Sequence, residues 1–204
     1  MLTKLKYGAI NNKKIIIFLF GLSLIGIISG SLFITTISSN DKIEVVEYIK
    51  GFIKNINDFN IKSSIMSLLI SNIGFIILIW LLGISIIGIP IILFMFFTKI
   101  FIIGFTISSF ILSYKTKGVL LAIIYVLPLQ IINILIYTLI TLYAIKISNN
   151  LIYCIFNKNT NYKLIPNKYV KILLISVVTI FINIIYESIL FPFLLNKITV
   201  LLKI

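Results

Sequence analysis

The chain lacks most of the residues from which active sites are built. It contains no histidine and no arginine, one cysteine, and only five acidic residues among 204. Without histidine there is no Ser–His or Cys–His nucleophile pair, and one thiol, Cys154, gives neither an internal disulfide nor the ligand spacing of a metal site. The sequence therefore predicts no enzyme activity, no metal site and no cofactor.

Apolar residues are abundant instead. Hydrophobic residues make up 60% of the chain and charged residues only 11%, and the mean hydropathy is +1.20. No soluble domain of this length buries so much apolar surface. We expect an all-α integral membrane protein with one domain over residues 1–204 and five transmembrane helices, each of about 20 residues.

The net charge of +13 comes from lysines that lie in short segments between apolar runs. They lack the arginine clusters and stacking residues of a nucleic-acid-binding face, so we expect no nucleic-acid partner. Loop lysines instead indicate topology and attract anionic lipid headgroups. The predicted partner of these charges is the lipid bilayer.

The first span is expected over residues 15–37, after a lysine-rich start that places the N-terminus in the cytoplasm. The run is too long for the apolar region of a cleaved signal peptide. Gly26 and Gly30 form a G-x-x-x-G pattern that is typical of close helix contacts, although small residues are also common in transmembrane helices generally. Both interpretations stay open.

Residues 38–63 form the only long polar segment that we place outside the membrane. Apolar residues recur there at three- and four-residue steps, and Asp41 and Glu44 have the spacing of a helix cap. Four acids balance four lysines, so the segment is not a polybasic anchor. We expect an amphipathic extracytoplasmic helix, either packed on the protein or docked to an extracytoplasmic partner.

The stretch from residue 72 to 112 is 41 residues long and carries a single charge, Lys99. It is about twice as long as one crossing requires, so it must turn. The turn lies either at Lys99 or at the sequence GISIIGIP. The second choice gives spans 64–82 and 90–114 with Pro90 in a first helical turn, and it leaves Lys99 within the membrane. We favour this choice, with a bent connection that dips into the membrane.

The fourth span is expected over residues 119–145 and contains Pro128 and Gln130. A proline frees a backbone carbonyl, and Gln130 or Asn133 is placed to satisfy exposed backbone groups across a helix interface. Structural hydrogen bonding is favoured over a ligand path. The basic segment 146–171 holds five lysines and no acid, so we place it in the cytoplasm.

The fifth span is expected over residues 172–195 and carries Glu187, the only acid within any span. An ionisable residue there is a functional candidate by default, although Glu187 is close enough to the outer end to reach the interface or to pair with Lys197. Pro192 is expected to close the helix. An odd number of spans places the C-terminus outside the cell.

Three classes of function are consistent with these residues. An enzyme fits worst, since no two titratable groups have an acid–base spacing. A transporter needs more convergent polar groups than one acid and a few amides. A membrane scaffold needs only helix faces and fits best, and it leaves open association with further copies of the chain.

Several short motifs add a resemblance. LLGISIIGIPII at residues 81–92, then Lys99, IIGFT at 102–106, YVLP at 125–128 and YES at 186–188 followed by a proline occur in the order and spacing found in stage II sporulation protein M. The chain resembles that family over nearly its whole length. Carried over by position, the motif residues are Gly83, Gly88, Pro90, Lys99, Gly104, Phe105, Pro128, Glu187 and Pro192. Gln130 is kept as a candidate beside them, although Leu129 separates it from the proline that the family's glutamine directly follows.

The resemblance implies a role in engulfment during endospore formation. It implies a non-enzymatic membrane protein that anchors a peptidoglycan-degrading complex with stage II sporulation proteins D and P. Relatives of this family also resemble accessory membrane proteins of circular-bacteriocin and ABC-exporter systems, and a membrane subunit of such a system is the alternative.

Overall fold

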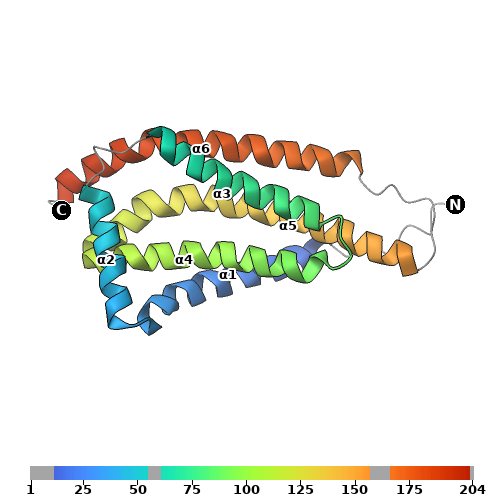
Figure 1. The fold of residues 1–204 in the computed structure, drawn as a ribbon, viewed down its shortest axis with the longest axis horizontal. Coiled ribbons are helices and arrows are strands. Elements are labelled where there is room, and N and C mark those ends of the chain that lie inside the picture. The colour runs from blue at the N-terminus through green and yellow to red at the C-terminus, as the bar shows by residue number, and fades with distance from the viewer. Residues whose placement is uncertain (1–11, 55–60, 157–165, 203–204) are drawn as a thin grey trace.

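The protein is an all-helical bundle in a computed structural model that describes residues 12–54, 61–156 and 166–202 (Figure 1). No strand occurs in these ranges. The predicted all-α fold is therefore confirmed. The elements are α1 (Asn12–Thr36), α2 (Ser39–Lys54), α3 (Ile61–Leu82), α4 (Gly88–Leu121), a π-helical turn η3 (Ala122–Val126), α5 (Leu127–Phe156) and α6 (Asn167–Leu202).

Within the described residues, five segments are long and apolar enough to cross a membrane, as predicted: 12–36, 65–82, 88–124, 127–156 and 167–188. Their outer faces are apolar. Ile17 is 70% exposed, Phe94 71% and Leu135 65%. Large exposed apolar faces of this kind mark contact with lipid or with other membrane helices, since a soluble monomer would bury them. The chain is a multi-pass membrane protein.

Helices α1 and α4 lie side by side and make the closest helix contact of the bundle (Figure 1). A Cβ atom on Gly30 would overlap the carbonyl oxygen of Phe101, and one on Gly104 would overlap the carbonyl oxygen of Ile27. The Ser31 hydroxyl donates a hydrogen bond to the Gly104 carbonyl at 3.2 Å. The structure therefore supports the first interpretation of the G-x-x-x-G pattern, a close helix contact. This contact joins two helices of the same chain.

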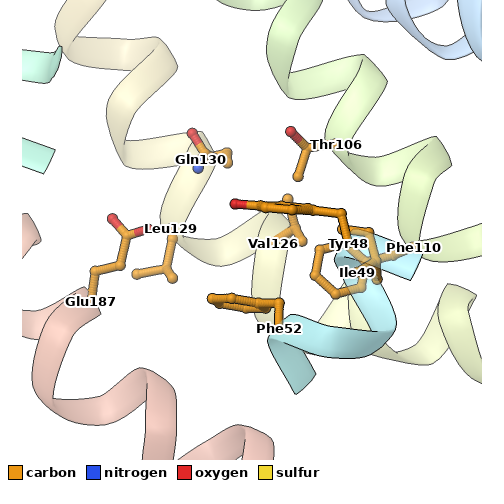
Figure 2. A pocket seen from close by; sticks show the side chains of 9 residues that line it. All are labelled: Tyr48, Ile49, Phe52, Thr106, Phe110, Val126, Leu129, Gln130 and Glu187. Carbon is orange, nitrogen blue, oxygen red and sulfur yellow. The ribbon is translucent and has the colours of Figure 1, made fainter. Parts of the chain in front are cut away.

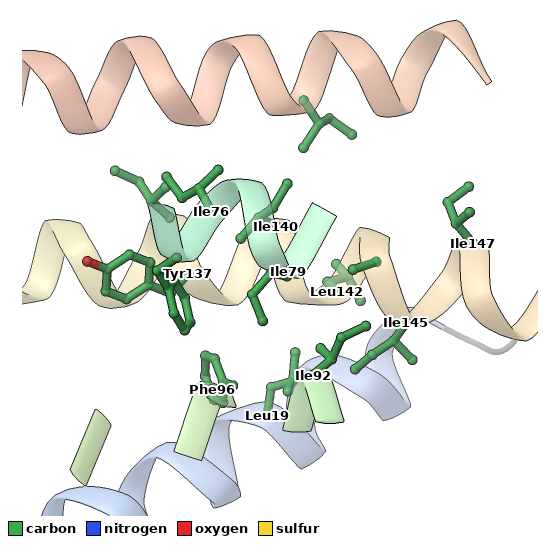
Figure 3. Packing of buried hydrophobic residues seen from close by; sticks show 14 of the residues in the cluster. Leu19, Ile76, Ile79, Ile92, Phe96, Tyr137, Ile140, Leu142, Ile145 and Ile147 are labelled. Carbon is green, nitrogen blue, oxygen red and sulfur yellow. The ribbon is translucent and has the colours of Figure 1, made fainter. Parts of the chain in front are cut away.

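The core joins α1, α3, α4, α5 and α6 along the length of the bundle. Leu19, Ile76, Ile79, Ile92 and Phe96 are completely buried and point toward one another from three helices (Figure 3). Because lipid is as apolar as these side chains, the core is held by close packing rather than by exclusion of water.

Helix α2 crosses one end of the bundle at a steep angle to the other helices (Figure 1). It buries Ile49 and Ile53 and leaves its charged side exposed, as expected of an amphipathic helix. The cap differs from the prediction: the Ser38 hydroxyl accepts a hydrogen bond from the Asp41 backbone N–H at 3.2 Å. Ser38 is therefore the N-cap residue, and the helix begins at Ser39, two residues before Asp41. Residues 55–60 of the predicted segment 38–63 lie outside the described residues, and 61–63 already belong to α3.

The break between α3 and α4 lies at residues 83–87, as the favoured choice predicted. Pro90 sits in the first turn of α4, where no intrahelical donor is lost. The turn is held by the Ser148 hydroxyl, which donates to the Ser85 carbonyl at 2.7 Å. Helix α5 extends about 12 Å beyond Ser148 at 1.5 Å per residue, so the turn lies beside α5 rather than at its end (Figure 1).

Tyr169 fixes this turn from α6. Its hydroxyl donates to the Trp80 carbonyl at 2.9 Å, and its ring stacks on the Trp80 ring at 5.4 Å between centroids. A Cβ atom on Gly83 would overlap the Tyr169 hydroxyl and approach the Ala144 Cα to 2.8 Å. Only glycine fits at position 83, because α5 and α6 both press on the end of α3.

The chain reverses at Lys115, whose backbone has φ 51° and ψ −126° inside α4. A Cβ atom on Gly118 would overlap the Phe110 carbonyl. In a straight helix, residues 110 and 118 would be about 12 Å apart along the axis, so this contact requires the chain to turn back. The third crossing therefore ends at Tyr114, as predicted. The fourth comprises the end of α4, η3 and α5.

Two predicted boundaries are wrong. Residues 146–156 were expected in the basic loop, but α5 continues through them to Phe156, and α6 already begins at Asn167. Pro192 was expected to close the last helix, yet α6 runs on to Leu202. Lysines at a helix end reach the interface while their backbone stays helical, and membrane helices tolerate proline when other groups satisfy the freed carbonyl.

The orientation across the membrane stays a prediction that cysteine labelling tests. In a Cys154→Ser background, we expect Tyr48→Cys on α2 to react with an impermeant maleimide in intact cells. Lys168→Cys at the start of α6 should react only after permeabilisation, because the lysine-rich end faces the cytoplasm. The opposite pattern of labelling would invert the proposed topology.

Candidate functional site

Polar side chains from four helices meet inside the bundle. We call them the polar network, and they include three residues from the predicted set, Lys99, Gln130 and Glu187. Polar groups are expensive in a membrane interior and are satisfied there by one another. The members are Ser71 and Asn72 from α3, Lys99 from α4, Gln130, Asn133 and Tyr137 from α5, and Asn183 and Glu187 from α6.

Lys99 is held by α3 and α5. Its half-buried ammonium group donates to the Ser71 hydroxyl at 2.9 Å and to the Ser71 carbonyl at 3.4 Å. The same nitrogen lies 5.6 Å from the centre of the Phe75 ring and 5.7 Å from that of the Tyr137 ring. Two cation–π contacts and two hydrogen bonds offset the loss of water around the charge.

Tyr137 ties α5 to α3. Its hydroxyl donates to the Asn72 side-chain oxygen at 2.8 Å, and only 1% of Tyr137 and 7% of Asn72 is exposed. The Phe75 ring meets the Tyr137 ring edge-on at 4.8 Å between centroids. Tyr137 thus supplies both the hydrogen bond and one of the two rings that face Lys99.

An amide chain continues the network from α5 to α6. The Asn183 side chain donates to the Asn133 oxygen at 2.9 Å, and the Asn133 side chain donates to the Gln130 oxygen at 3.2 Å. Gln130 was expected to satisfy the backbone freed by Pro128. Gln130 instead accepts a hydrogen bond from the Asn133 side chain, and the backbone before Pro128 widens into the π-helical turn η3.

Glu187 lies one helical turn beyond Asn183 on α6. It is 9% exposed, and its Oε2 atom is buried without a hydrogen-bond partner. Lys99 and Tyr137 lie close enough to interact with its charge. The predicted alternatives were reach to the interface or pairing with Lys197. The structure buries Glu187 and couples it electrostatically to Lys99, and the Lys197 side chain lies outside what the structure describes.

Glu187 also lines a cavity under α2 (Figure 2). The cavity holds about 200 Å³ and opens between α2, α4 and the start of α5. Its polar lining comes from Tyr48, Thr106, Gln130 and Glu187. Its apolar lining consists of Ile49, Phe52, Phe110, Val126 and Leu129. The network is thus accessible from the α2 end of the bundle.

The remaining predicted motif residues shape the helices and lie away from the network. Gly83 and Gly104 permit close helix contacts, and Phe105 lies beside Phe33 of α1 at 6.2 Å between ring centroids. A Cβ atom on Gly88 would overlap the Leu82 carbonyl across the turn. Pro90 lies in the first turn of α4 and Pro128 in the first turn of α5, while Pro192 lies within α6.

Sequence reasoning did not select Asn72, Tyr137 or Asn183 as site residues. One signal was available: Asn133 and Tyr137, and likewise Asn183 and Glu187, are four residues apart and therefore share a helix face. Nothing in the sequence pairs a face of α5 with one of α6 or α3. Within the described ranges, no three His, Cys, Asp or Glu side chains lie together in a way that could hold a metal ion.

The hydrogen bond between Tyr137 and Asn72 gives a direct test of the network. We expect Tyr137→Phe to lower the free energy of unfolding by about 1 kcal/mol, because the Asn72 oxygen loses its donor. Tyr186→Phe is the matched control, since Tyr186 is 50% exposed. The free energy of unfolding of both variants is measured in mixed micelles. Equal losses would show that the Tyr137 hydroxyl does not stabilise the network.

Comparison with known proteins finds one matching family model. A family model described as Stage II sporulation protein M matches residues 10–192, from the start of the first crossing into α6. No curated protein and no solved structure matches the chain. The family match covers all the motif residues and the whole polar network. The chain therefore belongs to the stage II sporulation protein M family, which indicates a sporulation-related multi-pass membrane protein.

Proposed function

We propose that this chain is a non-enzymatic membrane scaffold that anchors a peptidoglycan-degrading complex during engulfment. Its partners are membrane-anchored cell-wall hydrolases, with stage II sporulation proteins D and P as the candidates that family resemblance provides. The family is not a known enzyme family. The scaffold needs helix faces and an extramembrane docking element, and the chain has both.

The observation that carries the proposal is the exposed side of α2. The helix packs on the bundle through Ile49 and Ile53 but leaves Ile43 56% and Tyr48 74% exposed. Exposed tyrosine and isoleucine side chains beside mixed charges are typical of a protein-binding surface. A helix that served only as a linker would have no need to present them.

The polar network supports a holding role. Its hydrogen bonds run between side chains of α3, α5 and α6, and its one cation is fixed on α4 by Ser71 and two rings. Such interhelical bonds fix the helices relative to one another. A rigid bundle presents α2 and the exposed faces of the spans in one arrangement.

Genetic depletion and complementation test this function. Cells without the chain should form the polar septum but fail to engulf, and fluorescent hydrolases should not gather at the septum. The double variant Ile43→Ser and Tyr48→Ser should accumulate normally yet fail to recruit the hydrolases. Glu47→Ser, an exposed change on the same helix, should complement. Normal engulfment in depleted cells would refute the proposal.

A further inference from the structure

A groove runs beneath α2, formed by two adjoining cavities. The cavity that reaches Glu187 holds about 200 Å³, and its neighbour holds about 500 Å³ and reaches Glu44. Tyr48, Ile49 and Thr106 line both. We call this continuous space the α2 groove. Together the two cavities lie in the size range of small-molecule sites.

The groove has a carboxyl group at each end. Glu187 lines its inner end and Glu44 its outer end, and no described residue that lines either cavity is basic. Lys99 interacts electrostatically with Glu187, but its side chain does not line the groove and its ammonium group is bound to Ser71. The lining therefore favours a cation over an anion.

Glu187 lacks a hydrogen-bond donor. It is 9% exposed, its Oε2 atom has no partner, and its side chain points toward the cavity (Figure 2). A buried carboxylate oxygen without a donor costs free energy that a bound N–H group would recover. An ammonium group supplies the donor and the opposite charge together.

The groove walls require the rest of the ligand to be apolar. Phe52 and Phe110 line the inner cavity, Phe105 lines the outer one, and aliphatic side chains fill the intervening surface. Aromatic faces also attract an ammonium group. A transmembrane helix is about 10 Å wide and several turns long, which exceeds this space, whereas a headgroup with its first methylenes fits.

We propose that the α2 groove binds an amphiphile through a primary ammonium group, the chemistry of an aminolipid headgroup, with Glu187 as the carboxylate that receives it. Thr106 and Gln130 add further oxygen atoms to the lining of the same cavity. The ligand lies at the membrane end that α2 crosses. This inference goes beyond the scaffold function and does not depend on it.

Binding of dodecylammonium to the purified full chain tests the proposal. In a neutral detergent, we expect dodecylammonium to bind saturably and to raise the thermal unfolding temperature, whereas dodecanol and dodecanoate should not. Nanodiscs of phosphatidylcholine with or without phosphatidylethanolamine provide the lipid arm. Native mass spectrometry should show phosphatidylethanolamine retained in preference to phosphatidylcholine.

Two variants locate the site. Glu187→Gln should weaken dodecylammonium binding about tenfold, since one charge-assisted hydrogen bond is lost. Thr106→Leu should weaken binding as well, because the larger side chain fills space where the two cavities meet. This change leaves every charge in place. Glu47→Gln is the control, because Glu47 is an exposed acid on α2 that lines neither cavity.

Several outcomes would overturn the proposal. Equal binding of dodecylammonium and dodecanol would show only apolar partition. Unchanged affinity in both Glu187→Gln and Thr106→Leu, with folding confirmed by unfolding temperature, would place the amine elsewhere. If the chain bound a lysine-bearing transmembrane peptide but none of the amine amphiphiles, the ligand of the groove would be a protein and not a lipid.

Discussion

Gly30→Val is expected to separate α1 from α4 and to remove most of the folded protein from the membrane. A Cβ atom at position 30 would overlap the Phe101 carbonyl and lie 3.0 Å from the Phe105 backbone nitrogen. Both contacts are backbone, so no side chain can rotate away. The helices must move apart, which also strains the Ser31 bond to Gly104. We expect a loss of about 3 kcal/mol or more, at the upper end for overpacking.

Gly21→Val on the same helix is the matched control. No atom lies within 4 Å of a Cβ at position 21, so the change alters helix propensity and lipid contact alone. Accumulation in membranes and unfolding in mixed micelles measure both variants. If Gly30→Val and Gly21→Val lost stability equally, the α1–α4 contact would not be the close one described here.

Lys99→Met is expected to give the second-largest effect. The change removes both bonds to Ser71 and leaves the buried Glu187 without the positive charge that offsets it. Lys99 and Glu187 form no ion pair within the described residues, so the loss comes mainly from the charge-assisted bonds to Ser71 and the two cation–π contacts, which together contribute about 2 kcal/mol. We expect a loss of that size in the free energy of unfolding, measured in mixed micelles.

The double variant Lys99→Met and Glu187→Gln separates coupling from simple loss of contacts. With both charges removed, no uncompensated charge remains, and we expect the combined loss to be smaller than the sum of the losses in the two single variants. Lys171→Met, at an exposed position of α6, is the control. Strictly additive losses in the double variant would show that Lys99 and Glu187 act independently.

The fold was predictable wherever a single segment determines the outcome. Apolar length gave the five crossings, and Pro90 together with the glycines near it marked the break between α3 and α4. Local signals failed where several elements act together. Lysines after residue 145 resemble a loop, yet α5 continues, because Ile147 and Leu151 are buried in the core and Ser148 bonds to the α3–α4 turn. Pro192 resembles a helix end, yet α6 continues.

The candidate site was predictable only in part, for the same reason. Lys99, Gln130 and Glu187 stand out in the sequence because ionisable and amide groups are rare in membrane spans. Their partners are harder to select, since Tyr137 resembles an ordinary interface tyrosine and nothing in the sequence pairs the Asn183 amide with α5. Which of them meet depends on how α3, α5 and α6 rotate against one another. That rotation follows from packing of the whole bundle, so no single motif encodes it.

Quantitative co-purification from sporulating cells tests the scaffold account most directly. The full chain, crosslinked in intact cells at the onset of engulfment and purified in mild detergent, should enrich membrane-anchored cell-wall hydrolases over a control membrane protein. The Ile43→Ser and Tyr48→Ser double variant should lose that enrichment, while Glu47→Ser keeps it. Enrichment of an ABC-type ATPase without hydrolases would contradict the account and favour an exporter subunit.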